Sequence, residues 1–268
     1  MDEQIDPPSF PIVVDVPGWQ HVKPRIPDTP QRRKLAGQRT IREIVFGAKD
    51  GILTTMGVTI GLGAASGNSS TIIITGLLAL LSGSLSMGIG EFQGAKSERE
   101  VVLAAIEQES QEMREHPAEE FAEQVAYYKL KGFSSEEAHM IVRRLVQNPE
   151  IYLYEMMRDE FGVDPREAES SDVRPAIAMA LAFAGGSSLP IIPYFFGLSP
   201  LHGLIASVCM AFIGLFCVGY YAGTMGSKSP LSRGIEVLLY GSGVFAISFA
   251  AGRLIPPLFG HAPISLGG

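Results

Sequence analysis

Cysteine, tryptophan and histidine are scarce in this chain of 268 residues, which holds two Cys, one Trp and five His. Both cysteines, Cys209 and Cys217, lie in one apolar run, which excludes a fold built on disulfides. No GxxxxGK loop followed by Ser or Thr is present to bind ATP, and no GxSxG motif marks a nucleophilic serine. The histidines are scattered, so no Ser-His-Asp arrangement is evident. These absences predict a protein that is not an enzyme and does not use ATP.

Charged residues make up only 18% of the chain and are unevenly distributed. Residues 96–172 contain 19 Asp or Glu and 9 Lys or Arg, whereas the rest of the chain carries 9 acidic and 12 basic residues, which together give the net charge of −7. An acidic polar domain is therefore expected inside an apolar, slightly basic chain. Residues 1–40 are polar and rich in proline, which predicts a disordered tail.

Long apolar stretches indicate membrane-spanning helices. A bilayer core about 30 Å thick needs around 20 apolar residues per helix. Five stretches qualify: 43–65, 71–94, 175–197, 200–223 and 234–259. The fold class predicted is an all-α membrane protein with five transmembrane helices and a helical domain inserted between the second and third. The expected regions are 1–40 (tail), 41–95 (helices 1–2), 96–172 (acidic domain), 173–260 (helices 3–5) and 261–268 (C-terminal tail).

Basic residues beside these stretches predict the orientation of the helices in the membrane. Lys and Arg cluster before the first stretch, flank the acidic domain and recur at Lys228 and Arg233, while the loops at 66–70 and 197–200 carry no charge. By the positive-inside rule, the N-terminus, the acidic domain and the 224–233 loop should face the cytosol. Arg253 is the one discordant charge, and we expect it to snorkel or to pair internally.

Ionisable side chains inside the first two stretches are the first candidate site. Asp50 lies about two turns into the first stretch, where a charge costs a few kcal/mol and usually faces a pore or a partner. The alternative is that Glu43, Lys49 and Asp50 are interfacial or form structural pairs. Met87 and Glu91 are spaced i, i+4 and share a helix face. A thioether beside a carboxylate suits a borderline ion such as Fe2+ better than Mg2+ or Ca2+, unless Met87 is only apolar filler.

Capping signals divide the acidic domain into four helices. The first, about 95–115, continues the second stretch, and Pro117 is well placed to open the next, which runs to Gly132. Ser134 with Glu137 resembles a capping box and starts the third. Asn148 and Pro149 end that helix and open the fourth, which stops at Gly162.

Glutamates on these helices recur at helical spacings, and they are the second candidate site. The spaced residues are Glu109 and Glu112 (i, i+3), Glu120 and Glu123 (i, i+3), and Met156 and Glu160 (i, i+4). Packed together, the helices could bring five carboxylates and one thioether to a common point. A divalent cation would remove the repulsion between the carboxylates. The alternative is a solvated acidic surface. The Glu-x-x-His motif of di-iron bundles is absent after Glu112, which argues against oxidase chemistry.

Two motifs and the acidic insertion resemble the vacuolar iron transporter family of plants and fungi. The motifs are KDGILTTMGVTIG at 49–61 and SGSLSMGIGEFQGAKSERE at 82–100, and the resemblance covers roughly residues 40–260. It implies a five-span homodimer that moves Fe2+, and in some members Mn2+, out of the cytosol in exchange for protons. It also implies that Asp50 and Met87 line the path, with Glu43 and Glu91 as further path residues. The implied cytosolic metal ligands are Glu109, Glu112, Glu120, Glu123, Met156 and Glu160.

The function expected from this resemblance is a secondary transporter exporting Fe2+ or Mn2+, with Zn2+ and Co2+ as alternative bound ions. Its expected partners are protons, the lipid bilayer and a second copy of the chain, with no nucleic acid. The membrane would be vacuolar in a eukaryote and the plasma membrane in a bacterium. The rival hypothesis is a membrane-anchored metal buffer or sensor. Asp50 argues against the rival, because a mere anchor gains nothing from a charge inside a span.

Overall fold

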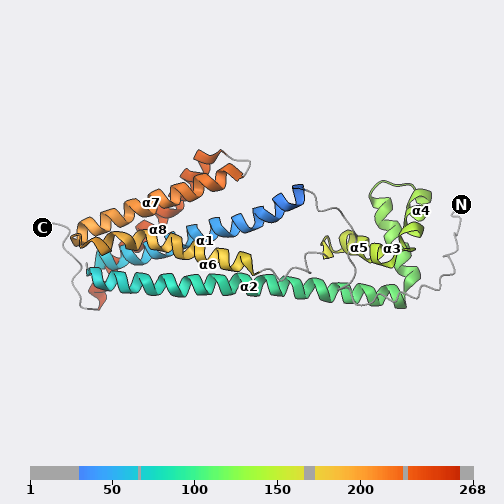
Figure 1. Ribbon diagram of the computed structural model, residues 1–268, viewed down its shortest axis with the longest axis horizontal. Helices are drawn as coiled ribbons and strands as arrows, with labels where there is room; N and C mark the ends of the chain where they lie inside the picture. Colours follow the sequence, from blue (N-terminus) through green and yellow to red (C-terminus); the bar gives the residue numbers. More distant parts are fainter. Residues whose placement is uncertain (1–29, 66–67, 166–172, 226–228, 260–268) are drawn as a thin grey trace. The chain divides into compact units, whose positions relative to one another are not determined.

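The computed structural model describes residues 30–65, 68–165, 173–225 and 229–259, and these residues form helices and no strand (Figure 1). The helices are α1 (Pro30–Ala65), α2 (Ser69–Glu115), α3 (Pro117–Leu130), α4 (Ser135–Leu145), α5 (Pro149–Glu160), α6 (Arg174–Ile191), the 3-10 helix η3 (Ile192–Phe196), α7 (Pro200–Met225) and α8 (Pro230–Leu258). The described chain divides into two compact units. The small unit holds residues 94–165, and the large unit holds residues 30–93 and 173–259.

The helix boundaries expected in the small unit are confirmed to within two residues. Helix α2 continues from the apolar stretch to Glu115 without a break, and Pro117 opens α3. Ser134 caps α4 in a complete capping box with Glu137, and the Asn148 side chain accepts a hydrogen bond from the Ile151 N–H at the start of α5. Local capping chemistry therefore sets the ends of these helices.

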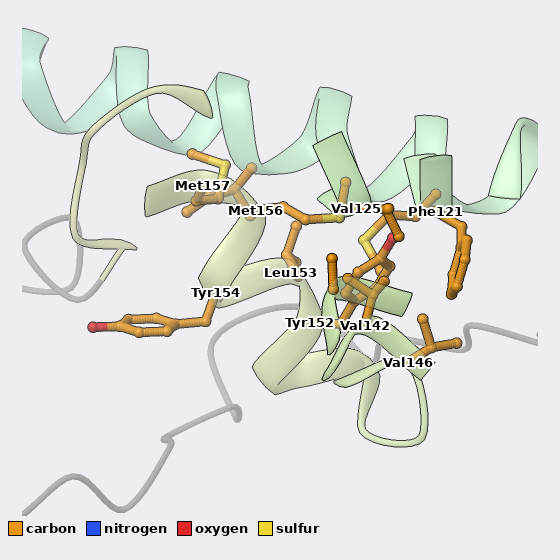
Figure 2. Close-up of a cluster of buried hydrophobic side chains, with 12 residues drawn as sticks. Phe121, Val125, Val142, Val146, Tyr152, Leu153, Tyr154, Met156 and Met157 are labelled. Carbon is orange, nitrogen blue, oxygen red and sulfur yellow. The ribbon is translucent and has the colours of Figure 1, made fainter. Parts of the chain in front are cut away.

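The core of the small unit is a cluster of buried apolar side chains from α2 to α5 (Figure 2). Leu153 and Met157 of α5 and Val142 of α4 are fully buried. The remaining members are Ile106, Met113, Phe121, Val125, Ala138, Val146, Tyr152, Tyr154 and Met156. Short helices such as these are marginal in isolation, so their shared core holds them together.

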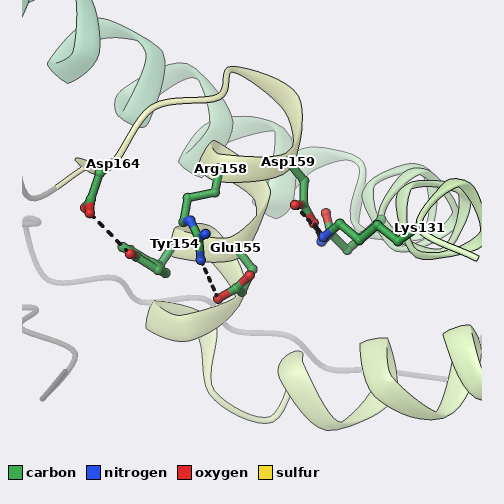
Figure 3. A network of polar contacts seen from close by, with 7 residues as sticks. Lys131, Tyr154, Glu155, Arg158, Asp159 and Asp164 are labelled. Atoms are coloured by element: carbon green, nitrogen blue, oxygen red, sulfur yellow. Dashed lines mark hydrogen bonds and ion pairs between the residues drawn. The ribbon is translucent and has the colours of Figure 1, made fainter. Parts of the chain in front are cut away.

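Polar contacts tie α5 to the end of α3 and to its own following loop (Figure 3). The Lys131 ammonium contacts both carboxylate oxygens of Asp159, and the Gln124 amide donates a hydrogen bond to the same group at 2.7 Å. Asp159 thus joins α5 to α3 directly before Glu160. A weaker contact joins the Tyr154 hydroxyl to Asp164 at 3.5 Å.

In the large unit, α1 packs against α6, α7 and α8. Glycines allow the closest approaches: a Cβ atom at Gly186 of α6 would collide with the Ala48 backbone, and one at Gly51 would collide with the Phe183 backbone. The Ser187 hydroxyl donates to the Gly51 carbonyl at 3.1 Å. Glycines spaced i, i+4 at Gly47/Gly51, Gly57/Gly61 and Gly219/Gly223 face neighbouring helices, whereas a Cβ atom at Gly90 or Gly94 would have no neighbour within 4 Å.

Four of the described helices are long and apolar enough to cross a membrane: α2, α6 with η3, α7 and α8. Helix α1, which contains the expected first span, is not among them, because Lys49, Asp50 and its many Gly and Thr residues lower its mean hydropathy. The described part of the chain is thus all-helical, with membrane-length apolar helices.

Helix α1 begins at Pro30, so residues 30–40 of the expected disordered tail are helical. Pro30 suits a first helical position, and the Gln, Arg, Lys, Leu and Ala that follow are good helix formers. Residues 1–29 and 261–268 of the two expected tails lie outside the described residues.

Candidate metal site

Glu109 is the centre of the acidic cluster in the small unit. Its side chain is 1% exposed, although it is a glutamate on a helix of a polar domain. Neither of its carboxylate oxygens receives a hydrogen bond. A buried charge without a partner is costly, so Glu109 requires a physical explanation.

Two further carboxylates lie beside Glu109. One ligand atom each from Glu109, Glu112 and Glu120 falls within 4.8 Å of the other two. Glu120 of α3 is also buried, and Glu112 is half-buried with one oxygen held by the Gln108 amide at 3.0 Å. The predicted spacing therefore does bring α2 and α3 carboxylates together, and they do not form a fully solvated surface.

The electrostatics of the cluster extend to the other predicted glutamates. Burial raises the pKa of Glu109 to about 8, and the charges of Glu160, Glu120 and Glu112 add to the shift. Burial also raises the pKa of Glu120, and its contact with Glu109 partly offsets this. Glu123 and Glu160 are exposed, and partial desolvation followed by the charge of Glu123 raises the pKa of Glu160. The charges of these two glutamates also reach the buried carboxylates of Glu109 and Glu120.

No cation neutralises this cluster within the described part of the chain. The ion pairs of the small unit engage other acids, such as Asp159 with Lys131 and Glu155 with Arg158. Oxygen donors at this spacing, with a mutual repulsion that a cation relieves, fit a divalent metal. Met156, the predicted sulfur ligand, is 2% exposed in the apolar cluster one turn before Glu160. A thioether ligand would favour first-row ions such as Fe2+.

A family model decides what kind of protein carries this site. The model described as the VIT family matches residues 41–253, well over half of the chain. The chain belongs to the VIT family. It is 28% identical to "Vacuolar iron transporter 1" of Arabidopsis thaliana over 243 residues, which cover 86% of this chain and 96% of the relative. It is 27% identical to "Vacuolar iron transporter 1" of rice over 84% of this chain and 89% of the relative, and 28% identical to "Protein CCC1" of Saccharomyces cerevisiae over 76% and 65%.

The predicted path residues of this VIT-family chain lie in the large unit, on α1 and α2. Glu43 is 4% exposed and accepts two hydrogen bonds from Arg42, which favours the structural-pair alternative for this residue. Asp50 is half-buried, and its neighbour Lys49 does not pair with it but lies 5.4 Å from the Phe46 ring centroid. The path role of Asp50 stays a prediction.

Met87 and Glu91 share the half-buried face of α2, as their spacing predicted. The neighbouring Leu85 and Ile89 are more than half exposed. The same face carries Gly83 and Gly88, at which an added Cβ would meet Phe183 and Ala180 of α6. Met87 and Glu91 therefore lie on the side of α2 that faces the helices of its own unit.

Sequence reasoning missed Tyr152. Its hydroxyl is buried without a hydrogen-bond partner in the same unit as the carboxylates. The available signal was its position four residues before Met156, which extends the i, i+4 pattern of Met156 and Glu160 by one turn.

Proposed function

We propose that this chain is a secondary transporter that carries Fe2+, with Mn2+ as a second substrate, out of the cytosol in exchange for protons. The observation that carries the proposal is Glu109, a buried carboxylate that converges with Glu112 and Glu120 and has no counter-cation among the described residues. Membership in a family whose relatives are named vacuolar iron transporters supports iron as the substrate.

The small unit would act as the capture site. Its proposed ligands are Glu109, Glu112, Glu120, Glu123, Met156 and Glu160. Five carboxylates attract any divalent cation, so Zn2+ and Co2+ are expected to bind as well, while the Met156 thioether favours first-row ions over Mg2+ and Ca2+. Because the pKa of Glu109 is raised to about 8, the metal-free site holds a proton near pH 7 and releases it when a cation binds.

The large unit would provide the passage. Asp50, Met87 and Glu91 are the proposed path residues, with Glu43 as a weaker candidate. In this proposal α1 also spans the membrane and, with the four apolar helices, brings the number of spans to five. Its contacts with α6, α7 and α8 shield its charged residues from lipid. An odd number of spans fits the basic flanks, with the N-terminus and the small unit in the cytosol. Five helices around a polar path favour a homodimer, in a vacuolar membrane or, in a bacterium, the plasma membrane.

Proton exchange would use carboxylates in the path. Asp50 would alternate between a metal-bound and a protonated state, because a carboxylate in a low-dielectric path binds a proton more readily than one in water. A proton gradient is the expected energy source, since the sequence has no phosphate-binding loop for ATP.

The proposal is tested by Fe2+ flux into proteoliposomes, with and without an imposed pH gradient, for the wild type and Asp50→Ala. We expect gradient-dependent flux that Asp50→Ala abolishes, with metal binding to the small unit unchanged. If the wild type binds metal but transports none under any gradient, the chain is a membrane-anchored buffer and the transporter proposal is wrong.

A further inference from the structure

Tyr152 begins the face of α5 that carries two of the proposed ligands. Tyr152, Met156 and Glu160 are spaced i, i+4 and i+8, so they follow one another along one side of the helix. Tyr152 is 3% exposed, and its hydroxyl forms no hydrogen bond. Buried polar groups are nearly always paired, so an orphaned hydroxyl needs an explanation.

The groups that act on this hydroxyl are the cluster carboxylates. Burial, followed by the charges of Glu120, Glu109 and Glu123, raises the pKa of Tyr152 above its ordinary value. The side chain therefore stays a neutral phenol, which can donate a hydrogen bond. In Figure 2 the Tyr152 ring extends toward Phe121 and Val125 of α3, the helix that bears Glu120, and all three belong to one buried cluster.

An unused donor and unused acceptors therefore share one buried region. Both oxygens of Glu109 lack a donor, just as the Tyr152 hydroxyl lacks an acceptor. Metal-ligating carboxylates are commonly oriented by a hydrogen bond from a group outside the coordination sphere. The small unit offers a buried phenol for that role beside carboxylates that have few other donors.

We propose that Tyr152 is a positioning residue of the metal site, whose hydroxyl donates a hydrogen bond to the ligating carboxylate of Glu109 when a divalent cation is bound. The inference rests on the proposed function, since it requires the small unit to bind metal. The hydroxyl of Tyr152 and the carboxylate oxygens of Glu109 have no hydrogen-bond partner among the described residues. A cation would bind one oxygen of Glu109, and the hydroxyl would orient the carboxylate through the other.

The experiment titrates Mn2+ into the full-length protein in detergent and follows binding by calorimetry. Tyr152→Phe removes only the hydroxyl. Tyr154→Phe is the matched control, because Tyr154 is equally buried on the same helix but its hydroxyl contacts Asp164. Loss of an outer hydrogen bond should weaken Mn2+ binding by about 10- to 100-fold in Tyr152→Phe. Tyr154→Phe should bind like the wild type.

Two further measurements separate positioning from packing. Thermal unfolding of metal-free Tyr152→Phe should occur at the wild-type temperature or higher, because the substitution removes a buried, unpaired hydroxyl. Adding Mn2+ to the wild type should produce a tyrosine difference spectrum as the phenol gains an acceptor, and Tyr152→Phe should lose it. If Tyr152→Phe fails to fold, the wild-type spectrum decides alone, and its absence overturns the inference.

Wild-type Mn2+ affinity in Tyr152→Phe would overturn the inference, as would a parallel loss of metal-free stability and affinity. Glu109→Gln separates this failure from failure of the proposed function. If Glu109→Gln loses Mn2+ and Tyr152→Phe does not, only the role of Tyr152 is wrong. If Glu109→Gln also binds like the wild type, the capture site itself is wrong.

Discussion

The two units of the molecule bury different kinds of polar side chain. In the small unit, the exposed helix faces carry charges such as Glu107, Lys129 and Arg144, and the interior holds the buried carboxylates of Glu109 and Glu120 as well as an apolar cluster. In the large unit, the most exposed side chains include Leu78, Ile247 and others of the same kind. Its fully buried polar residues are the hydroxyl-bearing Thr55, Thr59, Ser187 and Ser207.

This difference shows what each unit does with a buried polar group. In the large unit, most of the buried hydroxyls link helices: Thr59 lies 3.3 Å from Ser207, and Ser207 donates to the Pro190 carbonyl near the end of α6. In the small unit, Glu109 bonds to no donor. Paired groups stabilise a fold, whereas unpaired carboxylates are available to a ligand. The contrast separates a helix scaffold from a candidate metal site in one chain.

The largest expected effect is a loss of stability in the large unit alone. Gly186→Ala places a Cβ atom against the Ala48 backbone, which cannot move without separating α1 from α6. We expect a loss of about 3 kcal/mol or more in the free energy of unfolding of the large unit. Gly185→Ala is the control, because nothing lies within 4 Å of its Cβ position, and it should be neutral or slightly stabilising. Thermal unfolding in detergent measures both, and equal effects would contradict this packing.

The next largest effect is the pH dependence of the stability of the small unit. The pKa of Glu109 is raised from 4.5 to about 8 in the folded state, so its protonated form favours folding. The contribution is complete below about pH 4.5 and is lost as the pH rises through 8, a decline of a few kcal/mol at about 1.4 kcal/mol per pKa unit. Hydrogen-exchange protection of α3 and α5, corrected for intrinsic rates, should fall over this range. Saturating Mn2+ should flatten the decline.

Glu109→Gln sharpens the comparison by changing only the ligand site. Mn2+ binding to the small unit should weaken by about 100-fold, because the central carboxylate is lost. The metal-free unit should become more stable above pH 7, since a buried charge is removed. Glu107→Gln, two residues earlier on the exposed side of α2, should change neither property. Calorimetry with Mn2+ distinguishes them, and equal affinities would show that the cluster is an ordinary acidic surface.

The smallest effect tests the contact that precedes Glu160. Lys131→Met removes the ion pair with Asp159, whose side chain is 9% exposed. We expect a loss of about 1 to 2 kcal/mol in the stability of the small unit, because Asp159 keeps only the Gln124 hydrogen bond. Lys129→Met, at an exposed position in the last turn of α3, should leave stability unchanged. Chemical denaturation of both variants measures the difference.

Local signals predicted much of the fold. Pro117, Ser134 and Asn148 each act within one helical turn, so their capping roles could be read from the sequence. The apolar stretches likewise predicted α6, α7 and α8, because composition alone distinguishes a membrane-length helix. The start of α1 at Pro30 was missed, since the proline-rich composition of the tail outweighed the helix formers that follow.

The sequence predicted which residues of the candidate site share a face of one helix, but not which helices bring them together. The i, i+3 pairs place Glu109 with Glu112, but burial of Glu109 and its approach to Glu120 depend on packing between helices. Tyr152 could not be assigned because a tyrosine in an amphipathic helix is usually core, and only its orphaned hydroxyl distinguishes it. Likewise, the pairing of Glu43 with Arg42 depends on side-chain geometry that spacing does not encode.

The division of labour between capture and passage is tested most directly by Fe2+ flux into proteoliposomes over a range of Fe2+ concentrations. Asp50→Ala should abolish flux at every concentration while Mn2+ binding to the small unit persists. Glu109→Gln should raise the half-saturating Fe2+ concentration by about 10-fold or more and leave maximal flux near the wild-type value. Wild-type flux in Asp50→Ala, or an equal loss of maximal flux in both variants, would contradict the account.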